Sequence, residues 1–545
     1  MKTNVSLCIA AALMVAACGD PSHRHNSGEK VSVINSTPDE VIEEDVEITS
    51  NEAALMEPSA NATSKMILSS PPQQRNAETY KEIKENSFVA VAQQPVTTFS
   101  ADVDRAAYAN VRRIIGYGQI PPKDAVRIEE MVNYFDYDYP APEEGSASPL
   151  RISPELAPAP WNPNHLLLRI GLQAKKIDLA KAPPSNIVFL IDVSGSMDEE
   201  NKLPLLKSSF KMLLGQLRPD DKIAIVTYAN GTKVALPSTS VKDKEKIIKV
   251  LDNLYASGGT SGGKGIQLAY EQAQKSFIKN GNNRIILATD GDFNIGINNT
   301  TDLEKFIEKQ RESGIYMSVL GFGIGNYRDD MAETIADKGN GNYAYIDNIT
   351  EAKKVLVNEL SGTLFAVAKD VKLQLEFNPK YVKEYKLIGY ENRMLANEDF
   401  TNDKKDAGEI GAGHTVTALY ELVPSDGKVA QSLRYQSQEL NEKGKGNELG
   451  FLKIRYKDPK VKDAKSVEIT EPLVFNKKAL KETSADYRFA ASVAEFGILL
   501  RDNSNKANAT YDQVIELAEG AIGKDPEGYR KEFVRLVKSV KMLPK

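Results

Sequence analysis

The sequence is poor in the residues and patterns that mark several common classes of protein. Its 545 residues include only 2 cysteines, 4 histidines and 1 tryptophan. Lys and Arg number 69 and Asp and Glu 75, so there is no basic excess of the kind that favours a nucleic-acid binder. No apolar run after residue 17 approaches the roughly 18 residues of a spanning helix, which argues against a channel or transporter. What remains is an ordinary globular composition, long enough for about three or four domains.

The first residues have the pattern of an export signal. An uncharged, mostly apolar run from Val5 to Ala17 leads directly into Cys18, and this junction resembles a bacterial lipoprotein box. We expect cleavage before Cys18 and lipidation of its thiol, which would anchor the mature protein to a membrane of the bacterial cell envelope. A plain secretory signal is the alternative. Gly19 stands where many inner-membrane lipoproteins have Asp, which favours the outer membrane over the inner one.

Cleavage would also remove Cys8, so no disulfide is expected. Residues 18–95 lack sustained periodicity and are rich in Ser, Asn, Pro, Glu and Gln, which predicts a disordered tether. Order is expected from near Phe99.

Between Phe99 and Phe135 the apolar residues recur at helical spacing and predict two helices. Tyr134, Tyr137 and Tyr139 follow as an aromatic cluster, which we expect to pack under a loop rather than to form a recognition surface. From 166 to 173 apolar residues alternate with others, the pattern of a half-buried strand.

From Asn186 to about Ala368 the pattern changes. Short apolar runs such as IVFLI, KIAIVTY and RIILAT alternate with segments of helical period. Strand and helix in alternation predict a doubly wound, mainly parallel sheet. Strand patterns return after Asp370.

Oxygen-bearing side chains gather at the ends of two of these predicted strands. Asp192, Ser194 and Ser196 follow the run IVFLI, and Asp290 follows RIILAT. Thr260 lies in a glycine loop that opens a predicted helix. Because open α/β sheets bind ligands at the carboxyl ends of their strands, these five residues are candidate ligands of one site. An all-oxygen site with two carboxylates suits Mg²⁺ or Mn²⁺ better than Ca²⁺.

This combination resembles the von Willebrand factor A domain with its metal-ion-dependent adhesion site. The resemblance implies that the hydroxyls of Ser194, Ser196 and Thr260 coordinate the cation, while Asp192 and Asp290 bind largely through water. It also implies that an Asp or Glu of a protein partner completes the coordination. The alternative is a buried hydrogen-bonded cluster of Asp and Ser without metal.

The flanks resemble a family of bacterial lipoproteins that carry such a domain, so the resemblance covers about residues 96–545. Strands on both sides of the A domain further predict that it is inserted in, or flanked by, a β-sandwich, with helices at both ends of the folded part. The expected order is a signal peptide (1–17), tether (18–95), N-terminal flank (96–185), A domain (186–368), β-rich domain (369–480) and helical segment (481–545).

Enzyme motifs are weak. Residues 258–265 match only part of a phosphate loop, since Gly265 stands where the Mg²⁺-binding Ser or Thr belongs. His165 and His414 are the only histidines of the folded region, too few for a zinc protease or a serine triad. We therefore expect a protein-binding module and no enzyme. A structural envelope protein whose metal only stabilises loops, and a metal-dependent hydrolase, remain as alternatives; the oligomeric state is open.

Overall fold

The computed structural model describes residues 78–102, 104–259, 262–291, 300–325, 327–426, 446–461, 464–502 and 506–544. The predicted signal peptide, Cys18, the tether up to residue 77, and Thr260 lie outside the described residues. In the described part of the chain, no helix combines the length and the apolar character needed to cross a membrane.

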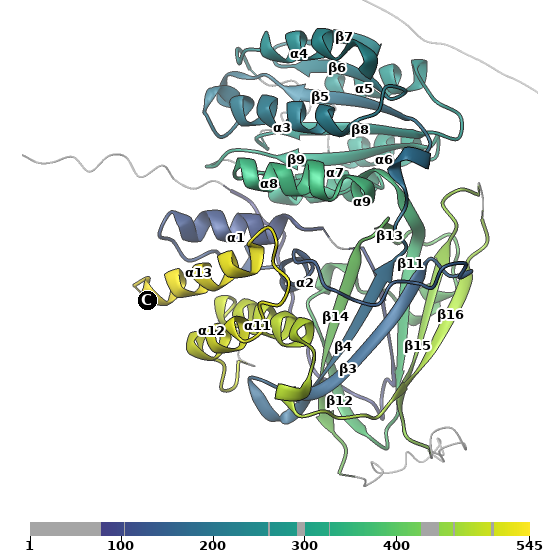
Figure 1. The fold of residues 1–545 in the computed structure, drawn as a ribbon, viewed down its shortest axis with the longest axis vertical. Helices are drawn as coiled ribbons and strands as arrows, with labels where there is room; N and C mark the ends of the chain where they lie inside the picture. The colour runs from purple at the N-terminus through teal and green to yellow at the C-terminus, as the bar shows by residue number, and fades with distance from the viewer. Residues whose placement is uncertain are drawn as a thin grey trace, which may run out of the picture. The chain divides into compact units, whose positions relative to one another are not determined.

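Residues 185–365 form a domain around a six-stranded sheet of order β10-β9-β8-β5-β6-β7, and we call it the α/β domain (Figure 1). Its strands are β5 (Ser185–Asp192), β6 (Lys222–Tyr228), β7 (Thr232–Ser240), β8 (Asn282–Thr289), β9 (Ile315–Gly321) and β10 (Tyr343–Tyr345). Neighbouring strands are parallel except β6 and the edge strand β7. The predicted doubly wound, mainly parallel sheet is confirmed.

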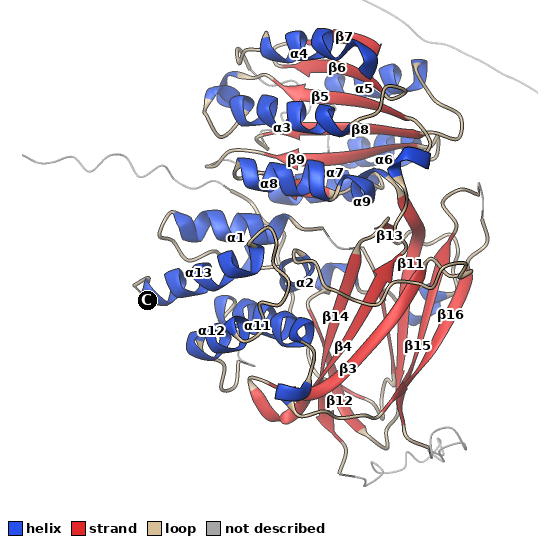
Figure 2. Ribbon diagram, viewed as in Figure 1, coloured by secondary structure: helices blue, strands red, loops and turns tan. Residues whose placement is uncertain are grey.

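Helices cover both faces of this sheet (Figure 2). They are α3 (Leu203–Gln216), α4 (Lys244–Asp252), α5 (Gly262–Lys275), α6 (Thr300–Arg311), α7 (Asp329–Lys338), α8 (Ile349–Lys353) and α9 (Leu360–Leu364). Because successive side chains of a strand point to opposite faces, the single apolar run of β5 serves two cores. Phe189 packs in the core that includes α3, while Val188 and Leu190 pack in the core that includes α5.

The strands before and after the α/β domain form a β-sandwich of two sheets. One sheet has the order β1-β12-β14-β4-β3 and the other β13-β11-β15-β16, with β2 also paired to β11. Its strands are β1 (Val89–Ala90), β2 (Val96–Ser100), β3 (Leu150–Ala159), β4 (Asn162–Ala174), β11 (Ala366–Phe377), β12 (Val382–Ile388), β13 (Gly408–Gly411), β14 (Thr415–Pro424), β15 (Glu448–Lys457) and β16 (Val467–Val474).

The α/β domain is inserted into this sandwich, as predicted. Strand β4, which precedes the domain, pairs with β14, which follows it, over eight residue pairs from Leu166 with Leu422 to Gln173 with Thr415. The two ends of the insert are hydrogen-bonded to two consecutive residues of the sandwich. Gly413 N donates to Lys175 O at 3.0 Å, and Ala412 N donates to Phe365 O at 2.8 Å. We call this junction the neck.

Helices from both ends of the chain form a layer on one sandwich sheet (Figure 1). They are α1 (Ala106–Gly116), α2 (Ile128–Asn133), α11 (Ala485–Leu500), α12 (Tyr511–Glu519) and α13 (Tyr529–Met542). They share one hydrophobic core with Leu167 of β4, and Tyr137 and Tyr139 are buried there as expected. The prediction of a half-buried β4 is wrong, because these helices cover its second face, including Arg169.

The predicted tether (18–95) includes residues that belong to the fold. Residues 78–95 contact the fold. Glu78 forms an ion pair with Arg113 of α1 at 2.8 Å, and the backbone of Thr79 pairs with that of Arg328 of the α/β domain in an isolated β-bridge. β1 lies in the same segment. Ion pairs and strand pairing thus order a polar stretch whose composition alone indicated disorder.

Four arginines outside the α/β domain bind its carboxylates, and we call them the arginine clamp. Their pairs are Arg105 with Glu359, Arg112 with Asp347 and Glu351, Arg127 with Asp329, and Arg393 with Asp337. The two carboxylates bound by Arg127 and Arg393 lie on α7. The clamp therefore holds this helix against the flanking parts of the chain.

Arg393 is the most connected member of the clamp. Its guanidinium lies 2.6 Å from Asp337, 3.0 Å from Asp102 and 3.1 Å from Asp104. Burial raises the pKa of Asp102 and of Asp104, and the positive charge of Arg393 opposes both rises. One side chain from the sandwich thus neutralises carboxylates that precede α1 and one that belongs to the α/β domain.

Candidate metal centre

Two carboxylates meet at the carboxyl edge of the parallel sheet. Asp192 is the last residue of β5, and Asp290 directly follows Thr289, the last residue of β8. These strands are parallel neighbours, and β5 also pairs with β6 on its other side. The edge beside β5 is therefore a topological switch point, the place where open α/β sheets bind ligands.

The hydroxyls of the loop after β5 lie close together. Ser194 N donates to Asp192 Oδ1 at 2.9 Å, which turns the loop back over the strand end. The Oγ atoms of Ser194 and Ser196 are 3.1 Å apart, and Thr289 Oγ1 donates to Asp192 Oδ2 at 3.3 Å. The structure thus brings together four of the five residues predicted as ligands.

The fifth predicted ligand, Thr260, lies outside the described residues, but the glycine loop before it is described. Ser257 N donates to Val193 O, and Gly195 N donates to Gly258 O, each at 2.8 Å. These bonds join the loop that leads to Thr260 to the loop that carries Ser194. The two segments are held side by side at the sheet edge.

The site is short of positive charge relative to its carboxylates. Asp192 and Asp290 are both buried. Burial raises the pKa of Asp192 to about 6, and the charge of Asp290 raises it further, while hydrogen bonds from Ser194 oppose the rise. A cation placed among these oxygens would lower the raised pKa of Asp192, because a nearby opposite charge favours the ionised carboxylate.

One basic side chain of the site was missed by reasoning from the sequence. Lys202, the residue before α3, lies with its Nζ 3.3 Å from Asp290 Oδ2 and donates to Ser196 O at 2.9 Å. Its side chain is only 3% exposed. The available signal was its position ten residues after Asp192, just ahead of a helix pattern, but a lysine there is more often a solvated first-turn residue.

The donors fit a small, hard cation. Two carboxylates and two neighbouring hydroxyls are oxygen ligands, which Mg²⁺ and Mn²⁺ prefer. Asp192, Ser194, Ser196 and Asp290 would hold the ion, with Thr260 as the remaining predicted ligand. Among the described residues, no three His, Cys, Asp or Glu side chains gather in a way that could bind a metal. A site at this edge accordingly depends on hydroxyl and water oxygens.

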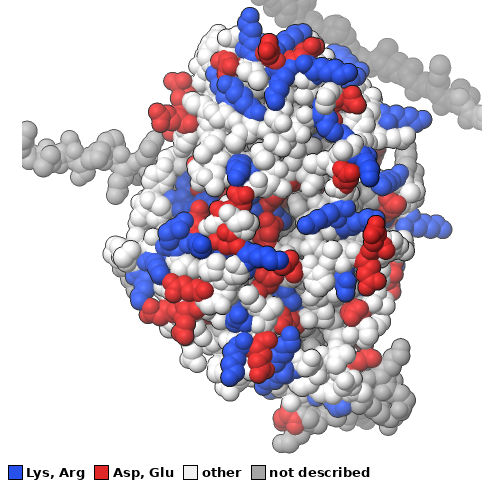
Figure 3. Space-filling view, in the orientation of Figure 1, with Lys and Arg blue, Asp and Glu red and all other residues white. Residues whose placement is uncertain are grey.

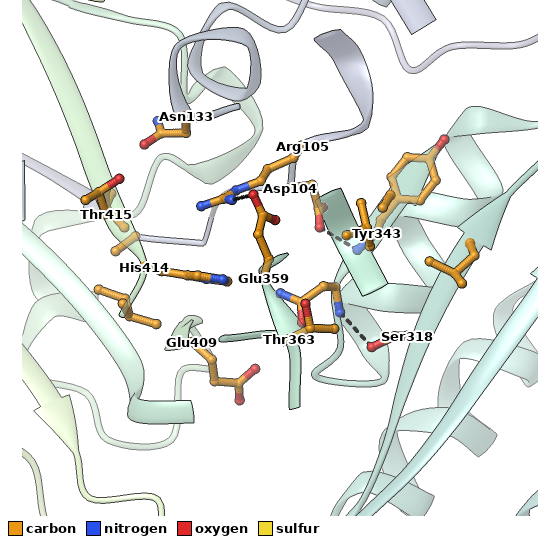
Figure 4. A pocket seen from close by; sticks show the side chains of 17 residues that line it. Asp104, Arg105, Asn133, Ser318, Tyr343, Glu359, Thr363, Glu409, His414 and Thr415 are labelled. Carbon is orange, nitrogen blue, oxygen red and sulfur yellow. Dashed lines mark hydrogen bonds and ion pairs between the residues drawn. The ribbon is translucent and has the colours of Figure 1, made fainter. Parts of the chain in front are cut away.

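Away from the metal edge, a cavity lies where the α/β domain meets the sandwich (Figure 4). This cavity of about 50 Å³ is lined by Arg105 and Glu359, which face each other, and by the ring of His414. Burial lowers the pKa of His414 to about 3, so the ring is neutral at pH 7. The volume suits a few water molecules and falls well below the roughly 300 Å³ of a small-molecule pocket. The cavity is therefore part of the joint at which Arg105 of the clamp meets Glu359.

Family models agree with this architecture. One described as von Willebrand factor type A domain matches residues 186–358, and one described as von Willebrand factor matches 74–169. Fold and sequence together define a protein built on a von Willebrand factor type A domain. A further model, for the C-terminal part of the uncharacterized protein YfbK, matches residues 362–543.

The uncharacterized protein YfbK of Escherichia coli (strain K12) is 48% identical to this chain over 465 residues, which is 84% of this chain and 80% of that protein. The chain belongs to the YfbK family. The uncharacterized protein sll0103 of Synechocystis sp. (strain ATCC 27184 / PCC 6803 / Kazusa) is 30% identical over 185 residues, covering 34% of this chain and 43% of the relative. A solved von Willebrand factor type A structure from Catenulispora acidiphila covers 84% of this chain and 91% of its own, with 14% identity and a TM-score of 0.39.

Proposed function

We propose that this chain binds a protein partner through a Mg²⁺ ion held at the carboxyl edge of the α/β domain. The observation that carries the proposal is the convergence of Asp192, Ser194, Ser196 and Asp290, two buried carboxylates and two hydroxyls 3.1 Å apart. When bound, the ion would supply a positive centre with a free coordination position. An Asp or Glu of the partner is the ligand that suits such a position.

The face drawn in Figure 3 offers little long-range attraction to that partner. Acidic and basic side chains are interspersed over the face in Figure 3, without a large area of one sign. Complementary fields raise association rates when they are present. On this face the attraction for a carboxylate would have to come from the metal itself.

The proposal includes a place for the protein. Lipidation of Cys18 would anchor it in the bacterial cell envelope, with the outer membrane favoured, and the segment up to residue 77 would separate the fold from the membrane. Metabolic labelling with a palmitate analogue tests this, since wild type would be labelled and Cys18→Ser would not. An unlabelled wild type contradicts the anchor and leaves the metal site untouched. We propose a binding module and no enzyme.

Metal binding is tested first. Isothermal titration of the full chain with Mn²⁺ and Mg²⁺ should give one site in wild type, with binding lost in Asp192→Ala and in Asp290→Ala. Asp198→Ala is the matched control, because Asp198 lies in the same loop but is exposed. Equal binding by all four proteins would contradict the site.

Partner binding is tested next by retention of envelope proteins on wild type and on Asp290→Ala, each with Mg²⁺ and with chelator. A protein retained only by wild type with Mg²⁺ would support metal-bridged recognition. Metal-dependent melting without any retained partner would instead favour the structural role, in which the ion only stabilises the loops. Turnover of a phosphate or ester substrate that is abolished by chelator would favour a hydrolase.

A further inference from the structure

The metal centre already contains a cation that belongs to the chain. The ammonium of Lys202 contacts three oxygens: Ser196 O at 2.9 Å, Glu199 Oε1 at 3.1 Å and Asp290 Oδ2 at 3.3 Å. Two of these three residues are predicted metal ligands. Glu199 is half exposed, whereas the Asp290 carboxylate is fully buried, so the pair with Asp290 is the one shielded from water.

The fold makes room for this side chain. The backbone of Gly323, in the loop after β9, has φ +81°, and a Cβ at this position would lie 2.3 Å from Lys202 Cε. Any other residue at 323 would displace the lysine stem. The loop of a third parallel strand therefore has a shape that admits Lys202 to the sheet edge.

The charges at the site decide what the ammonium does. Asp192 and Asp290 contribute two negative charges, and Lys202 contributes one positive charge next to Asp290. A divalent cation bound by the same carboxylates would stand close to the ammonium, and two positive charges in a buried site repel each other. Without metal, the same ammonium supplies the opposite charge that a buried carboxylate requires.

We propose that Lys202 is a built-in counter-ion that competes with Mg²⁺ for Asp290. It stabilises the metal-free site and weakens metal binding. In the loaded site it adds positive charge, which leaves the centre more attractive to a carboxylate. This inference rests on the proposed function, because it concerns the same metal site.

The test is calorimetric titration of the full chain with Mn²⁺ alone, comparing wild type with Lys202→Gln and Lys202→Met. Both variants should bind Mn²⁺ at least about tenfold more tightly than wild type, a change of about 1.4 kcal/mol. Lys211→Gln is the matched control, since Lys211 lies on α3, is 38% exposed and pairs with Asp252 away from the site. It should bind as wild type does.

Thermal melting supplies a second measurement that does not depend on the calorimetry. In chelator the Lys202 variants should melt below wild type, and Mg²⁺ should raise their melting temperature by more than it raises that of wild type. Variants that fold only with Mg²⁺ would support the proposal as well. Variants that stay unfolded with Mg²⁺ would overturn it, because the ion would then not replace the ammonium.

The possible failures are distinguishable. Equal or weaker Mn²⁺ binding by the folded Lys202 variants, with a clear site in wild type, would overturn the role of Lys202 and leave the metal site intact. No Mn²⁺ binding by wild type or by either variant would overturn the proposed function together with this inference.

Discussion

Glu495 provides a quantitative test of the packing in the helical layer. It lies in α11 and is fully buried. Burial raises its pKa to about 8, compared with an ordinary value of 4.5. The perturbation is Glu495→Gln, which keeps the size and polarity of the side chain and removes its titration.

The sign follows from the two pKa values. Between pH 4.5 and about 8 the folded chain keeps a proton on Glu495 that the unfolded chain releases. The contribution of Glu495 to the free energy of unfolding is therefore fully present below pH 4.5 and is lost as the pH rises toward 8. Each unit of pKa difference is worth about 1.4 kcal/mol. The loss therefore amounts to roughly 3 kcal/mol at pH 7 and roughly 5 kcal/mol above pH 8, both as upper bounds.

The assay is urea unfolding of wild type and Glu495→Gln at pH 5, 7 and 9. The stability gained by the variant should grow steadily across this series, and its own stability should depend less on pH. Glu519→Gln is the control, because Glu519 lies on the surface of α12, paired with Lys538 and half exposed. A constant difference between Glu495→Gln and wild type at all three pH values would refute the reasoning.

Further predictions concern the clamp and the metal edge. Arg393→Met should lower the free energy of unfolding, measured by chemical denaturation, by about 3 to 5 kcal/mol, because it leaves buried carboxylates without their counter-charge. Arg151 is 44% exposed, and Arg151→Met should leave that free energy nearly unchanged. Similar losses in both variants would argue against the clamp. Gly291→Ala should lose about 1 to 3 kcal/mol, since Gly291 has φ +86° and an added Cβ would lie 2.5 Å from Arg328 N. Thermal melting checks it against Gly116→Ala, where nothing lies within 4 Å of the added carbon.

Much of the architecture could be predicted from the sequence because the relevant signals are local. Apolar runs of strand length alternating with helical segments require a wound sheet. Strands on both sides of that sheet indicated the insertion, which the pairing of β4 with β14 confirms. The burial of Arg169 on the second face of β4 could not be predicted, since the helical layer on that face includes α11, which lies more than 300 residues away in the sequence.

The candidate site was predictable to the same extent and for the same reason. Asp192, Ser194 and Asp290 stand at strand ends, and parallel strands bring such ends to one edge. Lys202 was not predictable, because its burial depends on the loop of another strand, where Gly323 leaves space for its stem. The arginine clamp escaped notice because each of its pairs joins residues far apart in the chain.

The neck has a consequence for how the chain folds. Strands β4 and β14 pair across about 240 residues, and the entropy cost of closing a loop rises with its length. Lys175 and Phe365 accept backbone hydrogen bonds from Gly413 and Ala412, which are consecutive residues. Once the α/β domain has folded, its two ends lie close together, and it acts on the sandwich as a short connection. We therefore expect the inserted domain to fold first, and the sandwich to close around it without paying for the full length of the insert.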